Sequence, residues 1–290
     1  MPIVVGYDHS NSATVALDWA GQLGESSGAP VMVVHASERI VYARDVSHGL
    51  LDPARERESA VRIAQEGAKR LNAQHPALEV EAVGSILGAT VALDEASASA
   101  SMIVVGSHGR GRVSSVMLGS TAYALSGHAR CPVIVVREQD APLPGTGRPV
   151  VVGSDGSLSA EHAVDSAADI AQRWQAPLIV VSSWAPPPPD PWENPPFGYP
   201  SVAAAIKARK EKATEANQDG VERVRSWYKH QDVEGLVVEA RPEDAIMNAS
   251  PNAAMLVMGS RGHTQFMGML LGSTARAVLH QSSTPVMIVR

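Results

Sequence analysis

Two glycine-rich stretches of the sequence contain the residues whose types and spacing could do chemistry. Each has a glycine, two residues, a second glycine, nine residues and then Gly-Ser, and the two stretches occupy residues 106–120 and 259–273. An apolar run precedes each stretch and a helical pattern follows it. A strand that leads through glycines to a helix N-terminus presents backbone N–H groups to an anion. Both stretches therefore predict a phosphate-binding loop.

Two further apolar runs in each half end at residues that could join such a loop in one site. Asp8 and Asp155 end the first run, and the second run ends at Ala36 in one half and at Ser183 in the other. In an open parallel sheet, ligands bind outside the carboxyl ends of the strands, where the strand order reverses. If the first and fourth strands are inner neighbours, as in a flavodoxin-like sheet, these residues and the glycine stretch share one crevice.

Strands and helices alternate along both halves of the chain. Apolar runs and helical periodicity predict, in the first half, strand 3–7, helix 12–28, strand 31–34, helix 52–73, strand 78–83, helix 89–99, strand 101–105, helix 119–128 and strand 133–136. The second half repeats this order, with matching strands at 150–153, 176–181 and 284–290. Strands that are apolar throughout and alternate with helices indicate a parallel sheet covered on both faces. The predicted fold class is α/β: two tandem doubly wound domains, flavodoxin-like or Rossmann-like, each a five-stranded parallel sheet flanked by helices.

The repeat also divides the chain, whose 290 residues suffice for two domains of ordinary size. We expect the first domain at 1–140, a linker rich in Pro and Gly at 141–149, and the second domain at 150–290. The second half is longer, and the proline-rich run 186–200 accounts for the difference. We interpret this run as a stiff loop over its own domain, although its composition also resembles ligands of aromatic-groove domains.

Composition narrows the class of partner. The chain is 44% apolar and 19% charged, with a net charge of −6 and no run of Lys or Arg. These values indicate a soluble globular protein and argue against nucleic acid or an anionic membrane as partner. Cys131 is the single cysteine, so no internal disulfide forms, and its place before an apolar run predicts a buried, inert thiol. No apolar run reaches 18 residues and the first strand leaves no room for a signal peptide, so we expect a cytoplasmic protein.

The glycine stretches resemble the nucleotide-binding motif of the universal stress protein family. They read G-S-H-G-R-G-R-V-S-S-V-M-L-G-S and G-S-R-G-H-T-Q-F-M-G-M-L-L-G-S. The similarity covers the whole chain, including V-V-G-Y-D and V-V-G-S-D at the first strand ends and the closing runs C-P-V-I-V-V and T-P-V-M-I-V. The nucleotide-binding branch of that family keeps this glycine motif and binds ATP, whereas another branch has lost it. The resemblance therefore implies an ATP-binding, tandem universal stress protein with one site in each half.

The resemblance also implies which residues contact the ATP, ADP or AMP. Asp8 and Asp155 would lie near the ribose, and the backbones of Ala36 and Ser183 would contact adenine. The remaining residues would wrap the ribose and phosphates, and the phosphates would hold any Mg²⁺. They are Gly106, Gly109, Arg110, Gly119, Ser120 and Thr121 in the first half, and Gly259, Gly262, Gly272, Ser273 and Thr274 in the second.

The residue types leave structural alternatives open. The glycines could serve only a tight strand-to-helix turn, and each aspartate could bond only the turn that follows its strand. We expect positive φ at Gly109 and Gly262, which valine adopts poorly. His35 has Ser182 as its counterpart, so it is interpreted as a structural strand-end histidine. The loop histidines lack the Cys, Asp or Glu neighbours of a transition-metal site.

Two classes of function compete. The first is a non-catalytic ATP-binding stress-response protein whose nucleotide occupancy changes its conformation or partners. The second is a slow Mg-dependent ATPase or a nucleotidyl-transfer enzyme. No G-x-x-x-x-G-K-[ST] occurs, and no acid or histidine repeats where it could activate a nucleophile, so the first class is favoured. A dinucleotide-binding domain is the weakest reading, because G-x-G-x-x-G is missing after the first strand.

The closing strands indicate how the halves could assemble. Strands 133–136 and 286–289 each end a sheet with an open edge. Pairing of these two edges would satisfy their backbone groups and join the halves into an internal pseudo-dimer. A further homodimer is compatible with the sequence.

Overall fold

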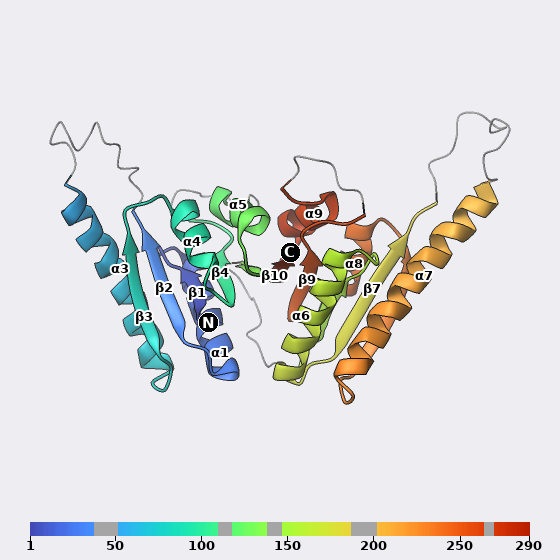
Figure 1. The fold of residues 1–290 in the computed structure, drawn as a ribbon, viewed down its shortest axis with the longest axis horizontal. Coiled ribbons are helices and arrows are strands. Elements are labelled where there is room, and N and C mark those ends of the chain that lie inside the picture. Colours follow the sequence, from blue (N-terminus) through green and yellow to red (C-terminus); the bar gives the residue numbers. More distant parts are fainter. Residues whose placement is uncertain (38–51, 110–117, 138–146, 187–201, 264–269) are drawn as a thin grey trace. The chain divides into compact units, whose positions relative to one another are not determined.

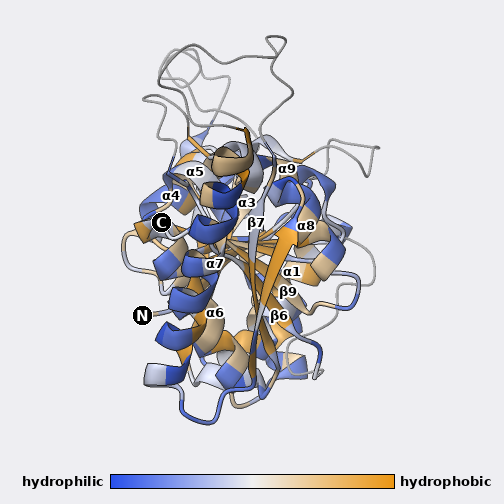
Figure 2. Cartoon of the chain, turned by 90° about the vertical axis from the view of Figure 1, so that its right-hand side faces the viewer, coloured by the Kyte–Doolittle hydropathy of each residue, from blue (hydrophilic) through white to orange (hydrophobic). Residues whose placement is uncertain are grey.

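The computed structural model describes residues 1–37, 52–109, 118–137, 147–186, 202–263 and 270–290. Contacts divide the chain into two compact units, one of Met1–Thr146 with Leu279–Arg290 and the other of Gly147–Val278. In both units the strands are mostly hydrophobic, whereas a covering helix such as α7 is largely hydrophilic (Figure 2). Both units have the predicted α/β architecture.

The first unit alternates strands and helices along the chain (Figure 1). Its elements are β1 (Ile3–Gly6), α1 (Asn11–Ser27), β2 (Val31–Ala36), α3 (Pro53–Gln74), β3 (Val80–Ser85), α4 (Ala89–Ser97), β4 (Met102–Gly106), α5 (Ser120–His128) and β5 (Val133–Val136). These strands are parallel and lie in the order β3-β2-β1-β4-β5. The strand order therefore reverses between β1 and β4, which are neighbours as expected.

The second unit repeats the arrangement. Its elements are β6 (Val150–Gly153), α6 (Leu158–Trp174), β7 (Leu178–Trp184), α7 (Val202–Trp227), β8 (Val233–Glu239), α8 (Pro242–Ala249), β9 (Met255–Gly259) and α9 (Ser273–Gln281). The parallel strands lie in the order β9-β6-β7-β8. The order reverses between β6 and β9, at the place that corresponds to β1 and β4.

Small residues at the strand ends let helices pack on both faces of each sheet. A β-carbon on Gly6 would lie 3.1 Å from Leu93 of α4, whereas the next residue, Tyr7, lies against Gly67 of α3. Because successive strand residues point to opposite faces, α4 and α3 cover opposite faces of the first sheet. The second sheet repeats this pattern, with Gly153 beneath Ile246 of α8 and the side chain of Ser154 near Gly220 of α7.

The first helix of each unit begins directly after the strand-end aspartate. Ser10 is the N-cap of α1 and accepts a hydrogen bond from the backbone N–H of Ala13 at 3.2 Å. Ser157 is the N-cap of α6 and accepts from Ala160 at 3.3 Å. Such caps each stabilise a helix by about 1 kcal/mol. They fix where the chain turns from the carboxyl end of the strand into the helix.

The two closing strands pair with each other. The strand β10 (Val286–Val289) runs antiparallel to β5, with Met287 opposite Ile134. Arg137 follows β5 and donates to the carbonyl oxygens of Leu279 and His280 at 2.6 and 2.9 Å. Arg290 follows β10 and donates to the carbonyl oxygen of His128 at 2.8 Å. The edge of β5 is thus covered, and the internal pseudo-dimer built on this pairing stays a prediction.

The structure tests three further expectations from the sequence. Cys131 is buried, and burial raises the pKa of its thiol from 9.0 to about 11. Within the described ranges, every helix is too short or too polar to span a bilayer. The strand expected at 78–83 is Val80–Ser85 instead, because the N–H of Leu78 bonds the carbonyl oxygen of His75 in a turn that follows α3.

Candidate functional site

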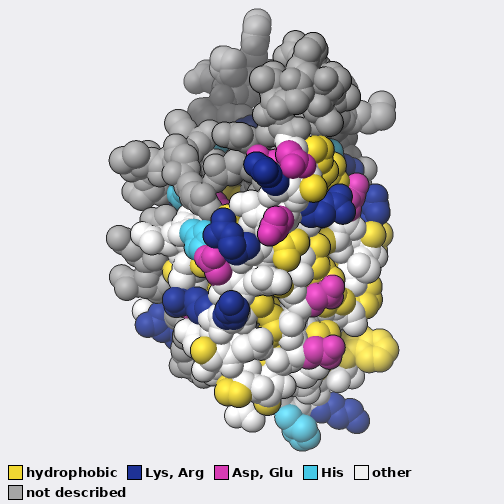
Figure 3. All heavy atoms as spheres, turned by 90° about the vertical axis from the view of Figure 1, so that its left-hand side faces the viewer, with side chains coloured by type: hydrophobic (Ala, Val, Ile, Leu, Met, Phe, Trp, Pro, Cys, Tyr) yellow, Lys and Arg dark blue, Asp and Glu magenta, His cyan; other side chains and the backbone are white. Residues whose placement is uncertain are grey.

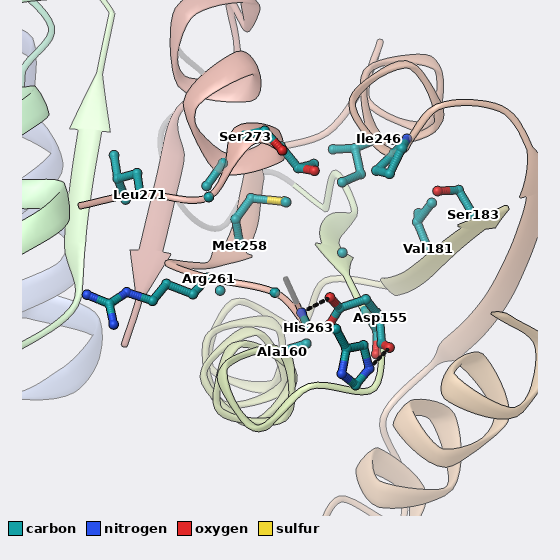
Figure 4. Close-up of a pocket in the computed structure, with 18 residues that line it drawn as sticks. Asp155, Ala160, Val181, Ser183, Ile246, Met258, Arg261, His263, Leu271 and Ser273 are labelled. Carbon is teal, nitrogen blue, oxygen red and sulfur yellow. Dashed lines mark hydrogen bonds between the residues drawn. The ribbon is translucent and has the colours of Figure 1, made fainter. Parts of the chain in front are cut away.

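A pocket of about 410 Å³ opens at the carboxyl ends of β6, β7 and β9 in the second unit (Figure 4). Residues from the strand ends, the glycine loop and the first turn of α9 line it. They include every residue that the sequence predicts for this half: Asp155, Ser183, Gly259, Gly262, Gly272, Ser273 and Thr274. Strand order explains this convergence, since the pocket lies where the order reverses.

The pocket has an apolar wall that the sequence analysis did not identify. Val181, Ile246 and Met258 line it from β7, α8 and β9, and all three side chains are buried. Figure 4 shows them around the centre of the pocket, with Ser183 and Ser273 at its margin. An apolar wall beside polar backbone groups suits a ligand with one flat apolar part and one polar part.

Close approach of backbone to backbone explains the first glycine of the loop. A β-carbon on Gly259 would lie 2.8 Å from the carbonyl oxygen of Ser159. In the first unit, a β-carbon on Gly106 would lie 2.6 Å from the carbonyl carbon of Ser12. Any larger residue would push the loop away from the start of the helix that follows the first strand.

The second glycine of the loop faces the strand-end aspartate. A β-carbon on Gly262 would lie 2.6 Å from Oδ2 of Asp155, and one on Gly109 would lie 2.9 Å from Oδ2 of Asp8. The expectation of positive φ at these two glycines is wrong, because the described glycines with positive φ are Gly28, Gly147 and Gly156. The carboxylate beside the loop, and not the backbone angle, therefore favours glycine here.

Asp155 links the strand end to both the helix and the loop. Its Oδ1 accepts from the backbone N–H of Ser157 at 3.0 Å, and its Oδ2 accepts from the backbone N–H of His263 at 3.2 Å. The ring Nε2 of His263 also bonds the backbone carbonyl oxygen of Asp155 at 2.8 Å. Asp155 thus bonds the turn that follows its strand, and it also lines the pocket.

The first unit brings its predicted residues to the equivalent place. Oδ1 of Asp8 accepts from the backbone N–H of Ser10 at 3.0 Å, and the backbone N–H of Gly119 donates to the carbonyl oxygen of Ser107 at 2.7 Å. Ala36 ends β2, and Ser120 is the first residue of α5.

Three predictions remain, for Thr121, Arg110 and the proline-rich run. Thr121 lies beside α4, because its hydroxyl accepts from that of Thr90 at 3.4 Å. Arg110 lies outside the described residues, and so does the proline-rich run after Pro186. The structure therefore places every predicted site residue of the first half except Arg110.

Sequence reasoning missed two serines in each unit, one that contacts the glycine loop and one that caps the first helix. The hydroxyl of Ser12 donates to the carbonyl oxygen of His108, and the hydroxyl of Ser159 accepts from the backbone N–H of Arg261 at 3.5 Å. Ser10 and Ser157 are the helix N-caps. The repeated pattern D-x-S-x-S, at residues 8–12 and 155–159, carries this signal.

The histidine at the end of the second strand has a structural role, as expected. The Nδ1 of His35 bonds the backbone carbonyl oxygen of Tyr7 at 2.6 Å, and His35 is buried. In the second unit, the hydroxyl of Ser182 donates to the carbonyl oxygen of Ser154 at 2.7 Å. Both contacts join the second strand of their unit to the residue that follows the first strand.

Charge is distributed without a dominant patch on the face that Figure 3 shows, where basic and acidic side chains are interspersed. At the second pocket, the side chain of Arg261 extends away from the other labelled residues (Figure 4). Among the described residues, no three His, Cys, Asp or Glu side chains are grouped to hold a metal ion. The donors that the described loop offers an anion are therefore mainly backbone N–H groups and hydroxyls.

Comparisons with known proteins agree with the resemblance of the motifs. The sequence model described as the Universal stress protein family matches residues 1–137 and 147–290. Universal stress protein Rv2623 of Mycobacterium tuberculosis is 29% identical over 306 residues, which cover 99% of this chain and 96% of that protein. Universal stress protein Mb2028c of Mycobacterium bovis is 32% identical over 302 residues, with the same coverage. A crystal structure of a universal stress protein from Archaeoglobus fulgidus shares the fold, with a TM-score of 0.70 at 19% identity over 100% of this chain and 98% of that one.

Proposed function

Because the chain belongs to the universal stress protein family, we propose that each half binds an adenine nucleotide. Occupancy of these sites would set the conformation of the protein or its choice of partner during the stress response. The bound nucleotide is ATP, or its products ADP and AMP. The observation that carries this proposal is the second pocket, where seven residues chosen by motif and strand-end position line one cavity of about 410 Å³.

The two sides of the pocket match the two parts of a nucleotide. Val181, Ile246 and Met258 offer an apolar surface on which a flat base can pack. The first turn of α9 supplies backbone N–H groups and the hydroxyls of Ser273 and Thr274 for the ribose and phosphates. Gly259, Gly262 and Gly272 keep β-carbons out of this surface, so phosphate oxygens can approach the backbone.

A bound nucleotide would bring Mg²⁺ with it. Phosphate oxygens are the ligands that Mg²⁺ prefers, usually with one or two carboxylates and several waters. Asp155 in the second half and Asp8 in the first have a carboxylate beside the second glycine of each loop. Both already accept backbone N–H groups, so we assign the main Mg²⁺ ligands to the phosphates.

A slow Mg-dependent ATPase or a nucleotidyl-transfer enzyme is the alternative function. Mg·ATP held beside backbone donors is already partly stabilised toward phosphoryl transfer. In the described part of the second pocket, however, the ring Nε2 of the loop histidine, His263, already bonds the backbone carbonyl oxygen of Asp155. This arrangement favours binding over rapid turnover.

Mass spectrometry of the molecules released by denaturing the purified protein tests the proposal. We expect an adenine nucleotide in amounts comparable to the protein, and much less from a Gly109→Val/Gly262→Val double variant that stays folded. Release of equal amounts from both proteins would contradict the site assignment.

A steady-state ATPase assay separates the two functions. The binding function predicts turnover far slower than the 1–100 s⁻¹ typical of kinases, on the order of 0.01 s⁻¹ or less. Rapid turnover that is lost in Asp8→Ala while nucleotide binding persists would favour the enzyme.

A further inference from the structure

His263, in the described part of the second glycine loop, makes two hydrogen bonds to Asp155, just after β6. Its backbone N–H donates to Oδ2 of Asp155 at 3.2 Å, and its ring Nε2 bonds the backbone carbonyl oxygen of Asp155 at 2.8 Å. Both bonds join residues 108 positions apart in the chain. Figure 4 shows the ring of His263 folded back against Asp155 and away from the apolar wall.

The chemistry of the ring contact is fixed by its partner. A carbonyl oxygen only accepts hydrogen bonds, so Nε2 carries the hydrogen and donates it. Neutral histidine with this tautomer and protonated histidine both make the bond. The contact therefore does not require a charge on the ring.

Gly156 lies beside this ring, in the turn between β6 and α6. Gly156 has φ of 77°, and a β-carbon on it would lie 3.9 Å from Nε2 of His263 and 3.2 Å from the β-carbon of Ala216. The first half has His9 at this position, also with positive φ, and its ring bonds Glu66 at 3.1 Å and Tyr7 at 3.3 Å. The residue that corresponds to His263 in the first half is Arg110.

We propose that His263 is a positioning residue of the second site, which holds the described start of the glycine loop on the β6–α6 turn, so that the pocket wall formed by Gly259 and Gly262 keeps its shape for phosphate. This inference rests on the proposed nucleotide binding and adds that the base and the phosphates depend on different parts of the pocket. The apolar wall binds the base regardless of His263, whereas phosphate binding depends on the loop that His263 anchors. The anchoring residue is histidine in the second half, and the corresponding position in the first half is Arg110.

Ligands with and without phosphate test the proposal. The Gly109→Val protein serves as the background, because we expect this substitution to remove nucleotide binding at the first site and to leave the second site unchanged. In this background, His263→Ala is compared with His263→Gln, whose side-chain amide can reach the same carbonyl oxygen. The exposed His230→Ala is the matched control. Calorimetry measures ADP and AMP, and competition measures adenosine.

We expect His263→Ala to weaken ADP and AMP binding about three- to tenfold, as for the loss of one hydrogen bond, and to leave adenosine binding unchanged. His263→Gln should restore nucleotide affinity to within about twofold, and His230→Ala should have no effect. An equal loss for adenosine and ADP would mean that His263 only supports the fold, and no loss for any ligand would also overturn the inference. If the Gly109→Val background itself binds neither ADP nor adenosine, the proposed function fails at this site, and the inference fails with it.

Discussion

The hydroxyl of Ser182 donates to the backbone carbonyl oxygen of Ser154 at 2.7 Å, where the first two strands of the second half end. His35 and Tyr7 make the equivalent contact in the first half at 2.6 Å. Different side chains thus solve the same problem, which is to satisfy a buried carbonyl group at the carboxyl edge of the sheet. This edge also carries the aspartates that contact the glycine loops.

Replacing Ser182 by alanine should therefore destabilise the second half. The substitution removes the donor to Ser154, and Asn217, whose amide lies 3.4 Å from the same hydroxyl, loses one neighbour. We expect the free energy of unfolding to fall by about 1–2 kcal/mol. Urea titration monitored by fluorescence measures this change. The exposed Ser226→Ala is the control and should change it by less than about 0.5 kcal/mol; equal effects of the two variants would refute the role of the buried bond.

A pair of glycine substitutions tests close packing at the loop. Gly259→Ala should destabilise the protein by about 1–3 kcal/mol, because its β-carbon would lie 2.8 Å from the carbonyl oxygen of Ser159 and the backbone must shift. Gly272→Ala should cost less than about 0.5 kcal/mol, since the nearest atom to its β-carbon would be at 3.6 Å. Thermal unfolding of the two variants checks the order, and the reverse order would contradict the packing described above.

How much of the site the sequence predicts depends on how local each signal is. The glycine spacing and the strand-end aspartates are local patterns, and parallel strand order is enough to bring Gly262, Asp155 and Ser183 to one edge. The apolar wall could not be predicted from a sequence pattern alone. One of its residues, Ile246, lies on a helix whose sequence indicates only a short amphipathic segment. Its contact with the pocket depends on which face of the sheet that helix covers.

Other features depend on distances that no pattern encodes. The expectation of positive φ at Gly109 and Gly262 failed because the constraint is a neighbouring carboxylate, not the backbone angle. The bonds of His263 to Asp155 join residues 108 positions apart, and no sequence motif signals that these two residues meet. The start of α3 was predictable to within a residue, since Asp52 is an N-cap of a residue type that usually begins helices and Pro53 follows it.

The thiol of Cys131 should be unreactive in the folded protein. Burial raises its pKa from 9.0 to about 11, so the reactive thiolate is scarce at pH 8. We expect slow labelling by iodoacetamide at pH 8, rapid labelling in 8 M urea, and a rate in the folded protein that rises toward pH 11. Because folding favours the protonated thiol, its contribution to stability is complete below pH 9 and decreases as the pH rises toward 11. Fast labelling of the folded protein at pH 8 would contradict the buried position.

Binding stoichiometry tests the central claim, one adenine nucleotide in each half, most directly. Nucleotide-free protein is titrated with ADP in a calorimeter, beside a folded Gly262→Val variant in which valine would press on Asp155 from a β-carbon position 2.6 Å from Oδ2. The account predicts two equivalents of ADP for the unmodified chain and one for Gly262→Val. The same stoichiometry and affinity for both proteins would contradict it.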